Sequence, residues 1–337
     1  MLKEKIGQML IMGFRGADLS SIEPIRRAIS ERELGGVILF ANNVVDAKQL
    51  SALTHQLQQD ASTAKSLPLF MAMDYEGGTV ERLNKQAGFP ETYSAEELGA
   101  MDDAEIAKHA RQMAMTLKSV GINLNFAPVV DVNVNPENPI IGKRKRSFSK
   151  EAKRVATCAS MFARAHIDLG VRCALKHFPG HGSSLTDSHL GFVDITNTWQ
   201  PIELDPYRDL LSIYGDRIMV MIAHVVHSGF DEYAYPASLS QQIVQGVLRE
   251  QLHFNGVVVS DDMQMKAIVD HYGMDDALRL AINAGVDMLI FGNQLGSDIF
   301  SAADIVKRIE NMVLRGEIAE SRILQSYERV KAMRAHL

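Results

Sequence analysis

Three histidines, one lysine and one aspartate gather in one short segment of the chain, residues 176–189. Its chemically active members are Lys176, His177, His181, Asp187 and His189. The glycine and proline residues between them predict an irregular loop, and histidines on such a loop are seldom there for packing. The segment therefore indicates either a metal site or a group that transfers protons.

The metal interpretation depends on five residues of suitable types: His177, His181, His189, His224 and Asp187. A metal-dependent hydrolase of the amidohydrolase type would place a His-x-His pair after its first strand. The first apolar run of this chain instead ends in Gly13-Phe14-Arg15. We therefore expect no metal, and nothing else in the sequence indicates a cofactor.

The proton-transfer interpretation pairs Asp187 with His189. An aspartate two residues before a histidine on a turn can accept the imidazole N–H, fix the tautomer and raise the basicity of the other nitrogen. Lys176 and His177 would then donate hydrogen bonds to a hydroxyl-rich ligand. A separate carboxylate, from Asp261 or Asp262, could act as nucleophile or electrostatic stabiliser. A carboxylate with a distinct acid/base is the arrangement of a retaining glycosidase.

Short apolar runs that alternate with longer amphipathic segments must position these residues. The runs are residues 9–13, 37–40, 69–74, 122–129, 171–177, 218–224, 257–261 and 286–291. The helical patterns are residues 21–32, 46–62, 95–120, 150–169, 202–213, 241–252, 274–284 and 302–335. Runs of four to eight residues without polar alternation indicate strands buried on both faces.

Eight such repeats predict an α/β fold, a single (β/α)8 TIM-type barrel over residues 1–337, with the helices of residues 302–335 packed on the outer ring. An open doubly wound sheet is the alternative, but no G-x-G-x-x-G follows the first run. In a barrel the chemistry lies at the C-terminal ends of the strands. Polar residues follow five of the predicted strands, at positions 74–78, 176–182, 224, 260–262 and 292–293.

The composition is that of an ordinary globular protein, with 46% hydrophobic and 23% charged residues. The net charge of −6 argues against a nucleic-acid partner. Two cysteines give no disulfide framework, and no apolar stretch is long enough for membrane insertion. The N-terminus does not have the pattern of a signal peptide. We expect a cytoplasmic monomer, or a periplasmic protein if a native leader is missing from this chain.

Four ordered blocks of the sequence resemble glycoside hydrolase family 3, in its branch of bacterial β-N-acetylglucosaminidases. The resemblance extends roughly from residue 35 to residue 292. The blocks are Asp74-Tyr75-Glu76-Gly77-Gly78 with Arg82, residues 125–132 (NFAPVVDV), residues 176–182 (KHFPGHG) followed by Asp187-Ser188-His189, and residues 256–263 (GVVVSDDM).

The resemblance implies a role for each matching residue. Asp261 would be the nucleophile, and His189 the acid/base with Asp187 as its orienting partner. The implied sugar-binding residues are Asp74, Arg82, Arg146, Lys176 and His177. The dyad would let one barrel perform the whole reaction, whereas the larger β-glucosidases of the family take a carboxylic acid/base from a second domain.

The basic loop at residues 143–146 departs from the family pattern, because it is two residues longer than the pattern has. Arg144 therefore competes with Arg146 for the binding role. Tyr75 also stands where the pattern has glutamine.

The implied function is retaining exo-hydrolysis of terminal β-linked N-acetylglucosamine through a covalent intermediate on Asp261, on muropeptides released during cell-wall recycling. A β-glucosidase or β-xylosidase of the same family, a phosphorylase acting on N-acetylglucosaminides, and a metal-dependent barrel hydrolase are the alternatives.

Overall fold

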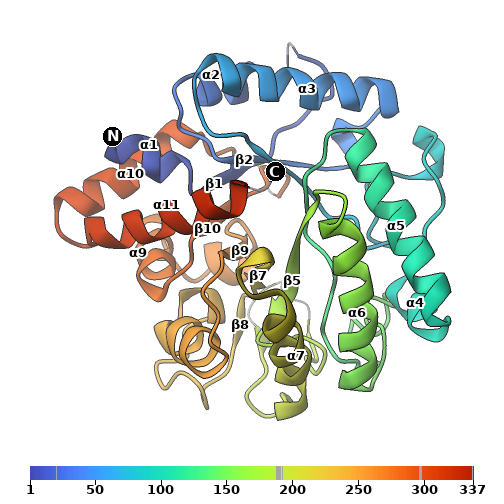
Figure 1. Ribbon diagram of the computed structural model, residues 1–337. Coiled ribbons are helices and arrows are strands. Elements are labelled where there is room, and N and C mark those ends of the chain that lie inside the picture. The colour runs from blue at the N-terminus through green and yellow to red at the C-terminus, as the bar shows by residue number, and fades with distance from the viewer. Residues whose placement is uncertain (20, 187–190, 192, 296–297, 336) are drawn as a thin grey trace.

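Eight parallel strands close into a barrel in the computed structural model, which describes residues 1–19, 21–186, 191, 193–295, 298–335 and 337 (Figure 1). The strand order around the barrel is β1-β10-β9-β7-β5-β4-β3-β2. The bounds are β1 Leu10–Met12, β2 Gly36–Leu39, β3 Phe70–Met73, β4 Leu124–Asn125, β5 Arg172–Phe178, β7 Met219–Ile222, β9 Val258–Asp262 and β10 Met288–Phe291. The predicted (β/α)8 fold is confirmed, and each predicted run overlaps one barrel strand.

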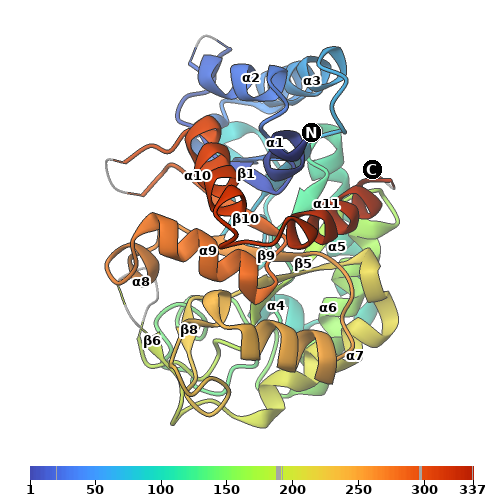
Figure 2. The same ribbon diagram turned by 90° about the vertical axis from the view of Figure 1, so that its left-hand side faces the viewer.

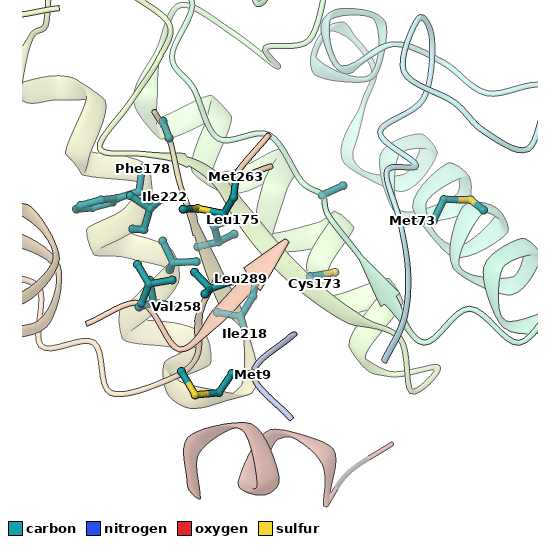
Figure 3. Packing of buried hydrophobic residues seen from close by; sticks show 14 of the residues in the cluster. Met9, Met73, Cys173, Leu175, Phe178, Ile218, Ile222, Val258, Met263 and Leu289 are labelled. Atoms are coloured by element: carbon teal, nitrogen blue, oxygen red, sulfur yellow. The ribbon is translucent and has the colours of Figure 1, made fainter. Parts of the chain in front are cut away.

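Successive residues of a strand face the barrel interior and the surrounding helices in turn. In β5, Ala174 packs in the interior cluster, while Cys173 and Leu175 belong to the cluster between strands and helices. Figure 3 shows this outer packing, with Leu175, Phe178 and Val258 among its members. Because both faces are covered, the strands are apolar throughout, which explains why their runs lack alternation.

The helices follow the predicted alternation, except that two predicted patterns are divided and two short helices, at residues 2–7 and 266–269, were not predicted. They are α1 Leu2–Gly7, α2 Glu23–Ser30, α3 Ala47–Thr63, α4 Ala95–Ala100, α5 Asp103–Ser119, α6 Ala152–Ile167, α7 Asp205–Tyr214, α8 Lys266–Val269, α9 Met274–Ala284, α10 Ala302–Leu314 and α11 Glu320–Arg334, with a π-helical segment, η6, at Gln242–Gln251. The pattern at 95–120 is two helices because Asp102 caps α5 by accepting from the Glu105 amide.

The C-terminal pattern at 302–335 also forms two helices, α10 and α11, and both contact α1 (Figure 2). Near its C-terminal end, α11 carries Val330 and Met333 into the interior cluster of the barrel. Arg334 donates to the carbonyl of Gly35, one residue before β2, and lies over the ring of Phe70 at the start of β3. The end of α11 thus covers the N-terminal end of the barrel, a position that its amphipathic pattern did not indicate.

A small parallel sheet of β6 (Val193–Asp194) and β8 (Val225–Val226) lies beside the barrel. It joins the connection after β5 to the connection after β7. Among the residues that the structure describes, no helix is both long and apolar enough to cross a membrane.

Candidate active site

A cavity of about 470 Å³ lies at the C-terminal ends of the strands. Six of the eight residues predicted for the site line it: Asp74, Arg82, Arg146, Lys176, His177 and Asp261. The other two, Asp187 and His189, lie outside the described residues. Asp262 and Arg144 also line the cavity, as do apolar residues of the barrel interior such as Phe126 and Ile290.

An irregularity in β5 brings Lys176 and His177 to the same face. Leu175 pairs with Val220 and Phe178 with Ile222, so three steps on β5 match two on β7. Such a bulge inserts one residue and re-aims the side chains around it. Leu175 and Phe178 both pack outward, and the two residues between them both line the cavity.

β9 contains a bulge of the same kind. Val259 pairs with Met288 and Asp262 with Ile290, again three steps against two on the neighbouring strand. Asp261 and Asp262 therefore both face the cavity, although adjacent residues of a regular strand would point to opposite sides. The sequence had left a choice between these two carboxylates, and the bulge places both of them at the site.

A buried ionic cluster forms one wall of the cavity. Arg146 binds Glu76 through two bonds, Nε to Oε2 and Nη2 to Oε1, each 2.7 Å long. Lys176 Nζ lies 2.6 Å from Glu76 Oε1 and 2.7 Å from Asp74 Oδ1. Arg82 is more loosely attached, with Nη2 3.9 Å from Asp74 Oδ2. Paired charges of this kind hold their donors in fixed positions before a ligand arrives.

The pairing decides the charge states within this wall. Burial by itself would raise the pKa of Glu76, but Arg146 and Lys176 lower it well below its usual range. Burial would likewise lower the pKa of Lys176, yet Asp74 and Glu76 raise it above its ordinary value. The wall is therefore ionised at neutral pH, with both cations available to bind hydroxyl groups.

Asp131 orients His177 from behind. Its Oδ2 lies 2.7 Å from Nδ1 of His177, and its Oδ1 accepts the backbone N–H groups of His177 and His181 at 3.2 and 2.8 Å. Arg146 Nη2 lies 3.3 Å from Nε2 of the same imidazole. Because Arg146 can only donate, His177 carries its proton on Nδ1 and accepts at Nε2.

The two carboxylates of β9 have different surroundings. The oxygens of Asp262 accept backbone N–H bonds from Gln264 at 3.0 Å and Gly292 at 3.3 Å. Burial, with the nearby charge of Asp261, raises the pKa of Asp262 to about 6. Asp261 accepts the N–H of Asp262 through Oδ1 at 2.8 Å.

Asn125, at the end of β4, fixes the backbone between Asp74 and Glu76. Its Oδ1 accepts the N–H of Tyr75 and its Nδ2 donates to the Tyr75 carbonyl, both at 3.0 Å. His166 of α6 supports the clamp, with Nε2 3.2 Å from Asn125 Nδ2. Burial lowers the pKa of His166 to about 4, so the imidazole is neutral and can accept this bond.

The described histidines of the metal interpretation have other hydrogen-bond partners. His181 Nδ1 lies 2.8 Å from Ser184 Oγ, and His224 Nδ1 lies 2.7 Å from Ser238 Oγ. Within the described part of the chain, no group of three or more His, Cys, Asp or Glu residues is arranged to hold a metal ion.

Two residues of the site were not singled out from the sequence, Glu76 and Asp131. Glu76 is two residues beyond Asp74, on the same side of an extended chain, so its spacing was a usable signal. Asp131 ends an apolar run and resembles a helix cap. Its role as partner of His177 follows only from the contact between the segment after β4 and strand β5 itself, where Val129 pairs with Lys176.

Comparisons with known proteins agree with this architecture. The family model of the glycosyl hydrolase family 3 N-terminal domain matches residues 1–333. Beta-hexosaminidase A of Pseudoalteromonas piscicida is 36% identical over 319 residues, which is 85% of this chain and 53% of that protein. The beta-hexosaminidase of Tolumonas auensis is 34% identical, over 84% of this chain and 82% of the relative. This chain thus spans about half the length of the first relative.

Two solved structures are similar over essentially the whole chain. The family 3 beta-N-acetylglucosaminidase of a Paenibacillus strain has a TM-score of 0.91 at 34% identity, covering 100% of this chain and 62% of that one. The beta-N-acetylhexosaminidase of Beutenbergia cavernae has a TM-score of 0.89 at 29% identity, covering 99% and 98%. Together with the matched family model and the cavity at the strand ends, these likenesses show that the chain belongs to glycoside hydrolase family 3.

Proposed function

We propose that this protein is a retaining exo-β-N-acetylglucosaminidase. The observation that carries the proposal is the cavity itself, which has an acidic pair on β9 and a preorganised wall of paired charges formed by Glu76, Arg146 and Lys176. Relatives named beta-hexosaminidase and beta-N-acetylglucosaminidase support the acetamido sugar as substrate. Muropeptides released during cell-wall recycling are the proposed source of that sugar.

The reaction would proceed by double displacement. An oxygen of Asp261 attacks the anomeric carbon while His189 gives its proton to the leaving glycosidic oxygen, so the aglycone departs as an alcohol. Water, deprotonated by the same His189, then releases the sugar from Asp261 with retained configuration. Asp187 would stabilise the imidazolium form that the first step needs. The roles of His189 and Asp187 depend on the sequence resemblance.

The contacts of Asp262 argue against this residue as the nucleophile. A nucleophilic carboxylate must be ionised and have a lone pair free to approach carbon. The oxygens of Asp262 are taken up by the backbone amides of Gln264 and Gly292, and its pKa of about 6 leaves part of it protonated in mildly acidic solution.

A comparison of chromogenic substrates tests the proposed substrate class. We expect hydrolysis of the β-N-acetylglucosaminide with little activity on the β-glucoside and β-xyloside. Hydrolysis of the latter two alone would refute the acetamido assignment. Assays with and without inorganic phosphate, with identification of the sugar product, separate hydrolysis from phosphorolysis.

Trapping identifies the nucleophile. A fluorinated N-acetylglucosaminyl fluoride should form a stable adduct, and mass spectrometry of the digested protein should locate it on Asp261. An adduct on Asp262 would contradict the proposed mechanism, and the Asp261→Asn variant serves as the unlabelled control.

A further inference from the structure

Two guanidinium groups line the cavity without a full set of partners. Among the described residues, no hydrogen bond or ion pair engages the side chain of Arg144. Nε of Arg82 is buried with no hydrogen-bond acceptor in the described structure, and its nearest carboxylate oxygen, on Asp74, is 3.9 Å from Nη2. Arg82 also lies over the ring of Phe40, 5.8 Å from its centre. These donors contrast with those of Arg146 and Lys176, which pair with carboxylates at 2.6–2.7 Å.

The loop that carries Arg144 is fixed against the cavity. Thr79, in the turn after β3, donates its hydroxyl to the carbonyl of Arg144 at 3.2 Å. The lysines on either side pair elsewhere, Lys143 with Glu137 at 3.2 Å and Lys145 with Glu96 at 3.7 Å, and neither lines the cavity. Only Arg144 of these three cations is therefore positioned to meet a ligand.

Exposure separates the two arginines of this loop by depth. Arg146 is 8% exposed and belongs to the buried wall, whereas Arg144 is exposed and marks the rim. An enzyme that removes a terminal sugar holds that sugar in the enclosed part of its cavity and leaves the rest of the substrate at the opening. Arg144 would therefore meet the aglycone.

We propose that Arg144, assisted by Arg82, binds a carboxylate on the aglycone next to the scissile bond. A guanidinium presents a planar fork of N–H donors that matches a carboxylate in two parallel bonds. The inference rests on the proposed function, because it assigns one part of the cavity to the leaving group of that reaction. The contact between Arg144 and this carboxylate gives the enzyme a preference for acidic saccharides over neutral ones.

The test uses two substrates that differ only in this charge, N-acetylglucosaminyl-β-1,4-N-acetylmuramic acid and its methyl ester. For the intact enzyme we expect kcat/KM to be about tenfold higher on the acid, as a charge-assisted bidentate contact would give. The Arg144→Gln variant should lose this preference, and Arg144→Lys should keep part of it. Added salt should reduce the preference, because the contact lies at an exposed rim.

Lys143→Gln and Lys145→Gln are matched controls, since each removes one positive charge from the same loop outside the cavity. Both should retain the preference for the acid, and all variants should melt close to the intact protein. An unchanged preference in Arg144→Gln overturns the proposal, and so does an equal loss in either lysine variant. A role of Arg144 in binding inorganic phosphate also overturns the proposal. In that case the intact enzyme shows no preference for the acid, and only Arg144→Gln loses phosphate-dependent release of the sugar 1-phosphate.

The same experiment distinguishes failure of the carboxylate contact from failure of the proposed glycosidase function. Hydrolysis of the acid and the ester at equal rates leaves the proposed glycosidase intact and refutes only the carboxylate contact. No hydrolysis of either substrate, or of the chromogenic N-acetylglucosaminide, refutes the proposed function and with it this assignment.

Discussion

Buried ionic clusters occur at both ends of the barrel, and one of them lines the cavity of the candidate active site. At the N-terminal end, Asp287 precedes β10 and is fully buried, bound by Arg249 at 2.7 Å, Arg322 at 2.8 Å and Arg329 at 3.2 Å. At the C-terminal end, Glu76 is bound by Arg146 and Lys176 at similar distances, but this cluster lines the candidate active site. The two clusters share their residue types and their pairing.

The difference is what surrounds the ions. Every oxygen of Asp287 is enclosed by donors, including Ser326 Oγ at 2.8 Å and the N–H of Val258 at 3.0 Å. Glu76 has comparable partners, but the cations that hold it also face open space. A strongly paired buried carboxylate therefore does not by itself indicate a functional site. It indicates one only where the cations that hold it can also contact a ligand. The two ends should respond differently to substitution.

The largest effect is expected from Asp261→Asn at the C-terminal end. Loss of the nucleophile should reduce kcat by about 10⁴-fold, on the scale of removing a member of a catalytic group in other hydrolases. The midpoint of thermal unfolding should change little, because asparagine has nearly the same shape and volume as aspartate. A variant that retained a tenth of the activity on a chromogenic N-acetylglucosaminide would show that the nucleophile lies elsewhere.

Asp287→Ala should have the next largest effect, on stability. Three guanidinium groups would lose their shared carboxylate, and breaking a buried pair in this way costs about 3–5 kcal/mol. Urea unfolding measures this loss, and kcat of the folded fraction should stay within about twofold of the intact protein. A loss of kcat without a change in unfolding would contradict the division between the two ends.

Two asparagines, one on β4 and one just before it, clamp opposite ends of β3. Asn123 clamps the start of β3, accepting from the Met71 N–H at 2.8 Å and donating to the Leu69 carbonyl at 2.9 Å. Asn125 clamps its end at Tyr75. Alanine at either position should destabilise by about 1–3 kcal/mol, because backbone groups lose their partners.

Only Asn125→Ala should change catalysis, with KM rising about tenfold as Asp74 and Glu76 lose their fixed positions. Asn123→Ala is the control that removes the same kind of clamp from the far end of β3. Equal kinetic effects in the two variants, measured at a temperature where both are folded, would show that the clamp at Tyr75 has no special role.

The smallest effect concerns the pH dependence of stability. The pKa of Asp262 in the folded protein is about 6, above its ordinary value near 4. The folded state therefore holds this proton more tightly. The resulting contribution to stability is complete below about pH 4 and is lost as the pH rises through 6.

Asp262→Asn should remove this dependence, so the difference in unfolding free energy between intact protein and variant should change with pH over this window. Glu76, Asp131 and Asp287 have lowered pKa values and act in the opposite direction, losing stability as the pH falls. Because they are present in both proteins, their contribution cancels. A constant difference from pH 4 to 7 would contradict the raised pKa.

Much of this molecule could be predicted from local pattern. The eight barrel strands were found because strands buried on both faces are apolar without interruption, and their polar ends located the site. The main errors in the helices occurred where capping by Asp102 divided a continuous amphipathic pattern, and where α11 turned to cover the barrel's N-terminal end.

Local sequence patterns were enough to predict the barrel, the end of it that forms the site, and the residue types present there, because hydrophobic periodicity and motif spacing are local properties of the chain. The tertiary structure decided which of these residues face the cavity together. Bulges in β5 and β9 turn adjacent side chains to one side, and contacts between distant segments pair Arg146 with Glu76 while Arg144 stays at the exposed rim. Register between strands and contacts between distant segments are set by the packing of the whole barrel, so no local pattern contains them.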